Sequence, residues 1–234
     1  MLKKETLLGV SKQTTCTSIL YTLLAQTLTI SSSTQSISPL YNPQAKLLQN
    51  GLDSMQKKVD LALAFDLDDP ETHALIQSTT SPGSHDRIAL SHMADTYTCT
   101  VPLVCPVEIK RPAGSQEEAE LQLAVWLYGS LQHLSALNPT VITDAPSDPY
   151  LPIHVAWMIV GHRWTFYLSW KDAITGAVNV YGPFPLKNEL GTGNMYELLA
   201  LVHTLKRMLQ YFDTDYRAAL EKTVYAAVAR VDEG

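Results

Sequence analysis

A long predicted helix that is apolar on most of its circumference constrains this fold most strongly. The helix begins with a capping-box pattern, in which Ser115 stands at the N-cap and Glu118 follows three residues later. Its apolar residues form two stripes, one with Leu121, Val125 and Tyr128 and the other with Leu123, Trp126, Leu127, Leu131 and Leu134. An amphipathic surface helix needs only one such stripe. We therefore expect this helix to pack broadly against a β-sheet.

A hairpin supplies the centre of that sheet. Residues 153–170 form two apolar and aromatic runs that meet at Gly161-His162, which predicts two antiparallel strands. Both faces of these strands are apolar, so we expect them to be covered on both sides. Leucine and alanine at helical spacing predict two further helices at residues 195–211 and 216–231.

Two more strands are expected upstream of the long helix. Residues 57–65 are mostly apolar and carry one acid, Asp60, which predicts a buried strand with a single charged position. Residues 99–110 predict a second strand region, which Pro102 and Pro106 interrupt because proline cannot donate a ladder hydrogen bond.

The remaining segments are read as one helix, several loops and a helix cap. Helical spacing predicts a short helix within residues 19–28, and polar, serine-rich or proline-rich composition predicts loops at 31–43, 78–86 and 138–152. The run of acids from Asp66 to Glu71 looks at first like a calcium loop. Asp69 directly before Pro70 is instead typical of an N-cap followed by proline at the first helical position.

Length, composition and charge limit the class of protein. With 234 residues and 46% hydrophobic content, the chain is expected to form one domain. Three cysteines do not suggest a disulfide framework, and no apolar run approaches the length of a membrane span. We therefore expect an intracellular protein, cytoplasmic or nuclear, that does not enter a membrane. The net charge of −6 provides no global basic field to attract nucleic acid.

Glu108 and Lys110 are the chemically most informative pair. Side chains alternate along a strand, so these two project to the same side while Val107 and Ile109 project to the other. Together with Asp60 on a neighbouring strand, they could hold a divalent metal and position a phosphate or a water molecule. A salt bridge at the edge of a sheet explains the same pair, and spacing alone favours that simpler interpretation.

A family resemblance changes this balance. Asp60 in Val59-Asp60-Leu61, the later Glu108-Ile109-Lys110, and a following helix that carries Gln122 resemble the PD-(D/E)XK nuclease superfamily, in particular nuclease-like domains of many fungal proteins. The superfamily core is a helix, three strands, a helix and a strand. The resemblance covers residues 57–170 and implies an α/β fold with a restriction-endonuclease-like core. In that fold, helices flank a central mixed β-sheet, here with extra N- and C-terminal helices.

The resemblance also implies roles for particular residues. Asp60 and Glu108 would bind a divalent cation, Mg²⁺ or Mn²⁺, together with the backbone carbonyl of Ile109. Lys110 would be the catalytic base or would position the attacking water, and Gln122 would contact the site. DNA or RNA would be the substrate, and the cations near these motifs in the sequence are Lys57, Lys58, Arg87, Lys110, Arg111 and Arg163.

The chain is expected to be a single nuclease-like domain, residues 1–234. Residues 1–56 would be an N-terminal extension of helix and loop, 57–170 the core, and 171–234 a C-terminal part of strand and helices. Three functions stay open: a metal-dependent phosphodiesterase, the same fold used as a binding or assembly module, and a fold redirected to a small-molecule reaction. The acidic charge and the two C-terminal helices favour the second, and a homo-oligomer or a protein partner also stays open.

Two other motifs are interpreted structurally. Gly191-Thr192-Gly193-Asn194 lacks a third glycine and a following Lys-Ser/Thr pair, so we read it as a turn with Asn194 as N-cap rather than a phosphate cradle. A zinc site would need closely spaced ligands. That spacing is missing from the nearest candidates, which are His85, His92, Cys99 and Cys105.

Overall fold

The computed structural model describes most of the chain from residue 37 to residue 232. The described ranges are 37–41, 44–46, 56–79, 88–93, 95–137, 151–172, 174–184 and 189–232. The helix predicted within 19–28, His85, Arg87 and most of the loops predicted at 78–86 and 138–152 lie outside these ranges. The division of residues 1–234 into an extension, a core and a C-terminal part stays a prediction.

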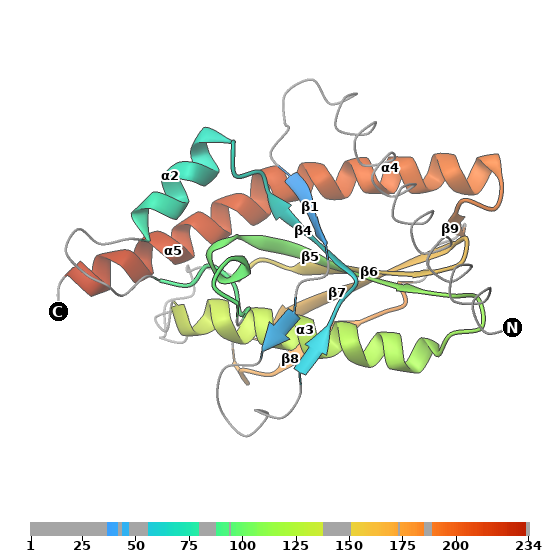
Figure 1. Cartoon of the computed structure of the whole chain (residues 1–234), viewed down its shortest axis with the longest axis horizontal. Helices are drawn as coiled ribbons and strands as arrows, with labels where there is room; N and C mark the ends of the chain where they lie inside the picture. The colour runs from blue at the N-terminus through green and yellow to red at the C-terminus, as the bar shows by residue number, and fades with distance from the viewer. Residues whose placement is uncertain are drawn as a thin grey trace, which may run out of the picture.

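A mixed β-sheet forms the centre of the molecule (Figure 1). Strands β5 and β6 are parallel, whereas the other neighbours in the sheet pair antiparallel. In spatial order the strands are β1 (Ile37–Tyr41), β4 (Leu61–Phe65), β5 (Leu103–Lys110), β6 (His154–Val160), β7 (Arg163–Lys171) and β8 (Val178–Tyr181), and β9 (Leu190–Gly191) also pairs with β7. A separate two-stranded ribbon consists of β2 (Gln44–Lys46) and β3 (Gln56–Lys58).

Helices cover both faces of the sheet, as Figure 1 shows. Helix α3 lies on one face and connects the parallel pair β5 and β6, and α4 and α5 run along the other face. The helical elements are α2 (Pro70–Ser78), the 3-10 turn η1 (Thr98–Thr100), α3 (Gln116–Leu137), α4 (Met195–Tyr211), the π-helical segment η3 (Phe212–Tyr216) and α5 (Arg217–Asp232). The predicted α/β class with helices flanking a mixed sheet is therefore confirmed. No helix among the described residues is long and apolar enough to cross a lipid bilayer.

Two apolar cores pack between the sheet and the helices, and α3 contributes residues to both of them. Under α3, Leu123 and Trp126 pack with Ala62 of β4 and Met158 of β6. The core on the opposite face contains residues of the sheet and of the C-terminal helices, among them Trp157, Leu205, Phe212 and Tyr216. The prediction that the long helix packs on a sheet is confirmed.

The predicted strand at 57–65 is two separate elements. Its first residues form β3, which pairs with β2, and its last residues form β4, which pairs with β1 and β5. The chain bends at Asp60 between them, and the Asp60 carboxylate accepts a hydrogen bond from the Ile109 N–H.

Two prolines lie inside strands, which corrects the predictions around them. The expected loop at 31–43 contains β1, and Pro39 is tolerated there because β1 is an edge strand. Pro106 lies within β5, which is continuous from Leu103, whereas residues 98–100 form η1 rather than strand. Pairing of β5 with β6 begins only at Val107, after the proline.

Local signals for caps and turns are confirmed. Asp69 caps α2, with Pro70 as its first residue, and Asn194 caps α4 by accepting hydrogen bonds from Tyr196 and Glu197. The Ser115 hydroxyl accepts a hydrogen bond from the Glu118 N–H at the start of α3, 3.1 Å away. The hairpin of β6 and β7 turns at Gly161 and His162.

The two C-terminal helices are continuous rather than separate. Between α4 and α5 the chain keeps helical dihedral angles through η3, where it widens to the π form. Phe212 and Tyr216 point from this segment into the core and are fully buried. Since residues 212–216 contain neither proline nor glycine, nothing in the segment breaks the helix.

A buried histidine joins α3, β6 and η3. The Nε2 atom of His154 lies 2.9 Å from the Ser130 hydroxyl and 3.1 Å from that of Tyr216, and its Nδ1 lies 3.1 Å from the Pro152 carbonyl. A carbonyl only accepts, so Nδ1 carries the proton of a neutral ring. Burial lowers the pKa of His154 to about 4, although the Pro152 hydrogen bond acts in the opposite direction.

We expect this histidine to make the fold sensitive to acid. The pKa of His154 is lower in the folded chain than the ordinary value of 6.5. The contribution of neutral His154 to the free energy of unfolding is therefore complete above pH 6.5 and is lost as the pH falls toward 4. The loss amounts to about 3 kcal/mol. Urea denaturation across this pH range should show it, and His154→Gln should flatten the profile. His162→Gln, at an exposed position, is the control, and parallel profiles for both variants and the wild type would contradict the prediction.

Candidate active site

Asp60 is brought beside the end of β5 by strand pairing. The antiparallel register of β4 and β5 places Leu61 opposite Val107, so the bend before β4 lies next to the last residues of β5. The Ile109 N–H donates a hydrogen bond to Asp60 Oδ2 over 2.8 Å. Two segments separated by 49 positions in the sequence are thereby fixed to each other.

Glu108 and Lys110 project from β5 toward α3. The Lys110 ammonium lies 3.0 Å from Glu108 Oε1, with 19% of the lysine side chain and 3% of the glutamate side chain exposed. The second carboxylate oxygen, Oε2, is buried and has no hydrogen-bond partner among the described residues. The pair is therefore an ion pair between a buried glutamate and a partly exposed lysine on an internal strand, not the bridge at a sheet edge that spacing alone favoured.

Gln122 completes this group from the helix above. Lys110 Nζ donates a hydrogen bond to Gln122 Oε1 over 3.0 Å. The cap at Ser115 fixes where α3 begins, and Gln122 then lies in its second turn above the end of β5. The four side chains of Asp60, Glu108, Lys110 and Gln122 are called the β5 cluster below.

The ionisation of the β5 cluster is strongly perturbed. Burial and the nearby negative charge of Asp60 raise the pKa of Glu108 to about 7, although Lys110 acts to lower it. Burial also raises the pKa of Asp60, against the hydrogen bond from Ile109 and the attraction of Lys110. Burial acts to lower the pKa of Lys110, but the hydrogen bond and charge of Glu108, with Glu118 and Asp60, raise it. Lys110 is therefore an ammonium at neutral pH.

The cluster suits a hard divalent cation. Two carboxylates close enough to repel each other, one with a buried unsatisfied oxygen, are the kind of ligand that Mg²⁺ and Mn²⁺ prefer. In the described part of the chain, no three His, Cys, Asp or Glu side chains are grouped as a metal site. A cation here would therefore depend on two carboxylates together with backbone oxygen and water.

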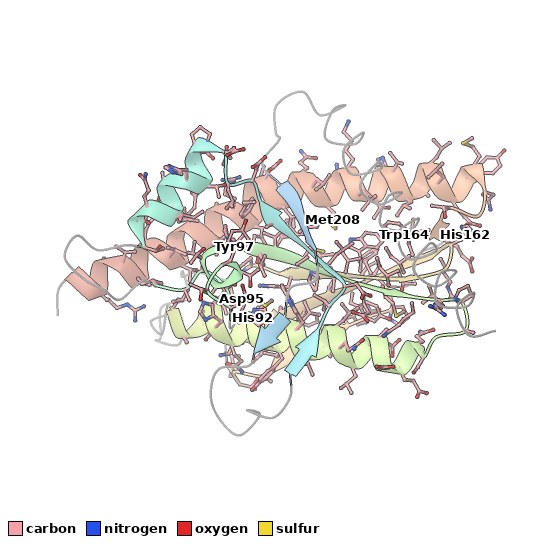
Figure 2. All side chains as sticks on the ribbon, viewed as in Figure 1. His92, Asp95, Tyr97, His162, Trp164 and Met208 are labelled. Atoms are coloured by element: carbon pink, nitrogen blue, oxygen red, sulfur yellow. The ribbon has the colours of Figure 1, made fainter. Side chains whose placement is uncertain are left out.

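The other sequence candidates lie elsewhere or serve the fold. His92 is buried with its ring edge-on to Trp126, and Cys105 is buried in the core. Figure 2 shows His92 with Asp95 and Tyr97 well away from His162, which lies at the end of the sheet near β9. The Ile109 N–H is committed to Asp60, and the role of its carbonyl as a ligand stays a prediction.

One residue near the cluster was missed from the sequence. Glu118 lies close enough to Lys110 to raise its pKa. It stands four positions before Gln122, so the two share one side of α3. That helical spacing was the available signal.

Comparison with protein families identifies the class of protein. A family model described as PD-(D/E)XK nuclease superfamily matches residues 12–217. The chain therefore belongs to that superfamily. Searches of curated proteins and of solved structures gave no significant match. Membership of a fungal branch stays a prediction.

Glu108 is expected to reduce stability at alkaline pH. The pKa of Glu108 in the folded chain, about 7, lies above the ordinary 4.5, so the folded state favours the protonated carboxyl. The stability that this proton binding provides is lost as the pH rises through 7. Glu108→Gln should therefore raise the free energy of unfolding near pH 8 by about 1–3 kcal/mol, and the gain should disappear near pH 4.5.

Urea denaturation at several pH values measures this difference. Glu117→Gln is the matched control, because Glu117 is an exposed acid at the start of α3. A Glu108→Gln protein that is less stable than the wild type near pH 8 would contradict the expected direction.

Proposed function

We propose that this protein is a metal-dependent phosphodiesterase that hydrolyses nucleic acid by attack of a water molecule on phosphorus. The observation that carries the proposal is the convergence of the β5 cluster, with the buried unsatisfied oxygen of Glu108 beside the carboxylate of Asp60. Membership of the nuclease superfamily supports the same reaction class.

The side chains of the β5 cluster have different roles in the proposed reaction. Asp60 and Glu108, with the Ile109 carbonyl, would hold the cation, which would supply Lewis-acid activation of a phosphoryl oxygen and of the attacking water. Lys110 donates hydrogen bonds and supplies positive charge where the transition state becomes more negative. Its raised pKa and its two acceptors support a role in positioning and charge stabilisation over a role as base.

Gln122 acts on Lys110 rather than on the substrate. Its Oε1 accepts a hydrogen bond from the ammonium and restricts where the other N–H bonds of Lys110 point. It is therefore a positioning residue. Removing its amide should reduce the rate less than removing Lys110 itself.

A second candidate is a binding module without hydrolysis. The net charge of −6 and the exposed acids Glu117 and Glu118 at the start of α3 favour it, because both repel a polyanion. In that case the carboxylates of the β5 cluster would bind no cation. The two functions therefore differ in a property that can be measured without a substrate.

Cleavage assays test the first proposal directly. We expect the purified protein with Mg²⁺ or Mn²⁺ to cut DNA or RNA, and Asp60→Asn, Glu108→Gln and Lys110→Ala each to lower the rate by at least about 100-fold. Gln122→Ala should lower it by about 3- to 30-fold. Product formation is followed on labelled oligonucleotides, with a chelator as the blank.

The chain contains a matched control for the Lys110 and Gln122 pair. Lys171 of β7 donates a hydrogen bond to Gln132 of α3 over 2.9 Å, at the other end of the same helix. Lys171→Ala and Gln132→Ala should leave cleavage close to the wild-type rate. Cutting by Lys110→Ala at the rate of these controls would exclude the proposed role of Lys110.

Metal binding is expected to stabilise the protein. A cation that binds only the folded form adds about 2.7 kcal/mol at 100 times its Kd. Thermal unfolding with increasing Mn²⁺ should therefore shift upward, and the shift should be absent in Asp60→Asn. An equal shift in both proteins, or none in the wild type, would favour the binding module.

A further inference from the structure

Arg163 lies in the same row of the sheet as Lys110. The parallel register of β5 and β6 places Lys110 beside Val160, and the antiparallel register of β6 and β7 places Val160 beside Arg163. Neighbouring strands are about 4.8 Å apart, so the backbones at Lys110 and Arg163 are separated by about 10 Å. Residues in one row of a sheet project to the same face.

The contacts of β7 confirm which face this is. Tyr167, four positions after Arg163 and therefore on the same side of the strand, packs in the core under α3 and donates a hydrogen bond to Glu120 of that helix. The intervening Trp164 and Phe166 pack in the opposite core. Arg163 consequently shares the α3 face with the β5 cluster.

Three connected turns hold the backbone of Arg163 in place. The Gly161 N–H donates a hydrogen bond to the Lys110 carbonyl over 3.2 Å, which ties the β6–β7 turn to the end of β5. A side chain at Gly161 would meet Pro112 at 3.0 Å, so these turns touch. On the other side, Thr192 donates from its N–H to the His162 carbonyl.

This contact explains one glycine of the Gly191-Thr192-Gly193-Asn194 motif. Gly191 pairs with Arg163, and a β-carbon at Gly191 would lie 2.4 Å from the His162 carbonyl oxygen. Gly191 therefore lets the backbone of this motif lie close against the β6–β7 turn. Figure 2 shows His162 and Trp164, on either side of Arg163, at this end of the sheet.

The side chain of Arg163 is available to a ligand. It is exposed, and within the described ranges no hydrogen bond or ion pair engages its guanidinium. Arg111, in the turn that follows Lys110, is likewise exposed and unengaged there. In the described part of the chain, two exposed guanidinium groups without a hydrogen bond or ion pair thus lie at this end of the sheet, although the chain as a whole is acidic.

We propose that Arg163 forms a phosphate subsite for the substrate strand, next to the phosphate that is cleaved, with Arg111 adding positive charge. This rests on the proposed hydrolytic function. One strand of nucleic acid carries a phosphate about every 3.4 Å of helical rise, so a strand seated over Lys110 places further phosphates within reach of Arg163. A guanidinium suits such a site because it can donate two parallel hydrogen bonds to one phosphate.

The substrate class follows from this geometry. Because the backbones at Lys110 and Arg163 are about 10 Å apart, a chain of several phosphates can contact both side chains at different phosphates. The substrate is therefore an oligonucleotide or longer strand, and a lone phosphodiester leaves the subsite empty. DNA and RNA share this backbone chemistry, and the experiment below separates them.

Binding is measured first, in a form that does not depend on cleavage. The full chain carrying Glu108→Gln is titrated against fluorescein-labelled single strands of DNA and of RNA, each about 12 nucleotides long, in the presence of chelator. Adding Arg163→Gln should raise the Kd by about 3- to 10-fold and reduce the slope of log Kd against log salt by about 0.7. Arg163→Lys should retain part of the affinity. The tighter of the two strands identifies the substrate.

Arg207→Gln is the matched control, since Arg207 is an exposed arginine on α4. Equal weakening by Arg163→Gln and Arg207→Gln, or an unchanged Kd for Arg163→Gln, would overturn the subsite. Unchanged unfolding midpoints for these variants verify that the fold is intact.

A cleavage assay with two substrates distinguishes failure of the Arg163 subsite from failure of the hydrolytic function. With Glu108 restored, Arg163→Gln should raise KM for the oligonucleotide and leave the hydrolysis of bis(p-nitrophenyl) phosphate, which has one phosphate, unchanged. Equal losses on both substrates would overturn the subsite. Arg163-dependent binding without cleavage of either substrate would uphold the subsite and reject hydrolysis.

Discussion

The parallel pairing of β5 with β6 determines where Gln122 and Arg163 lie relative to Lys110. Parallel neighbours cannot be joined by a tight turn, so the chain must cross one face of the sheet between them, and α3 is that crossover. The crossing places Gln122 above Lys110. The same pairing, continued through the β6–β7 hairpin, aligns Arg163 with Lys110.

The β5 cluster is held together at a cost in folding energy. Two carboxylates share a buried corner in which one oxygen of Glu108 is unsatisfied, and a single ammonium partly offsets their charge. A purely structural corner would be more stable with neutral side chains. The persistence of opposed charges in a buried position is typical of groups that are retained for binding or chemistry.

The features of the fold and of the site that depend on local interactions could be predicted from the sequence. The caps at Asp69, Ser115 and Asn194 depend on residues within one turn, and the spacing of Glu108 and Lys110 alone fixes their common face. The strand pattern also indicated Asp60, and the resemblance to a nuclease superfamily added Gln122, which the fold brings to the same corner.

The remaining features depend on contacts between distant segments. The split between β3 and β4 follows from pairing with different partners, and an apolar pattern cannot distinguish one long strand from two short ones. Pro39 is tolerated because β1 is at the edge, which is a property of strand order. The alignment of Arg163 with Lys110 likewise requires the order and direction of three strands, which no local pattern encodes.

The buried contacts of His154 have a consequence for α3 as a whole. Ser130 and Gln132 attach the C-terminal half of this helix to β6 and β7, while Gln122 attaches the N-terminal half to β5. The helix cannot slide along its axis or roll without losing bonds in both halves. The Lys110 side chain is therefore already ordered before a substrate binds, so binding does not lose the conformational entropy of ordering that side chain.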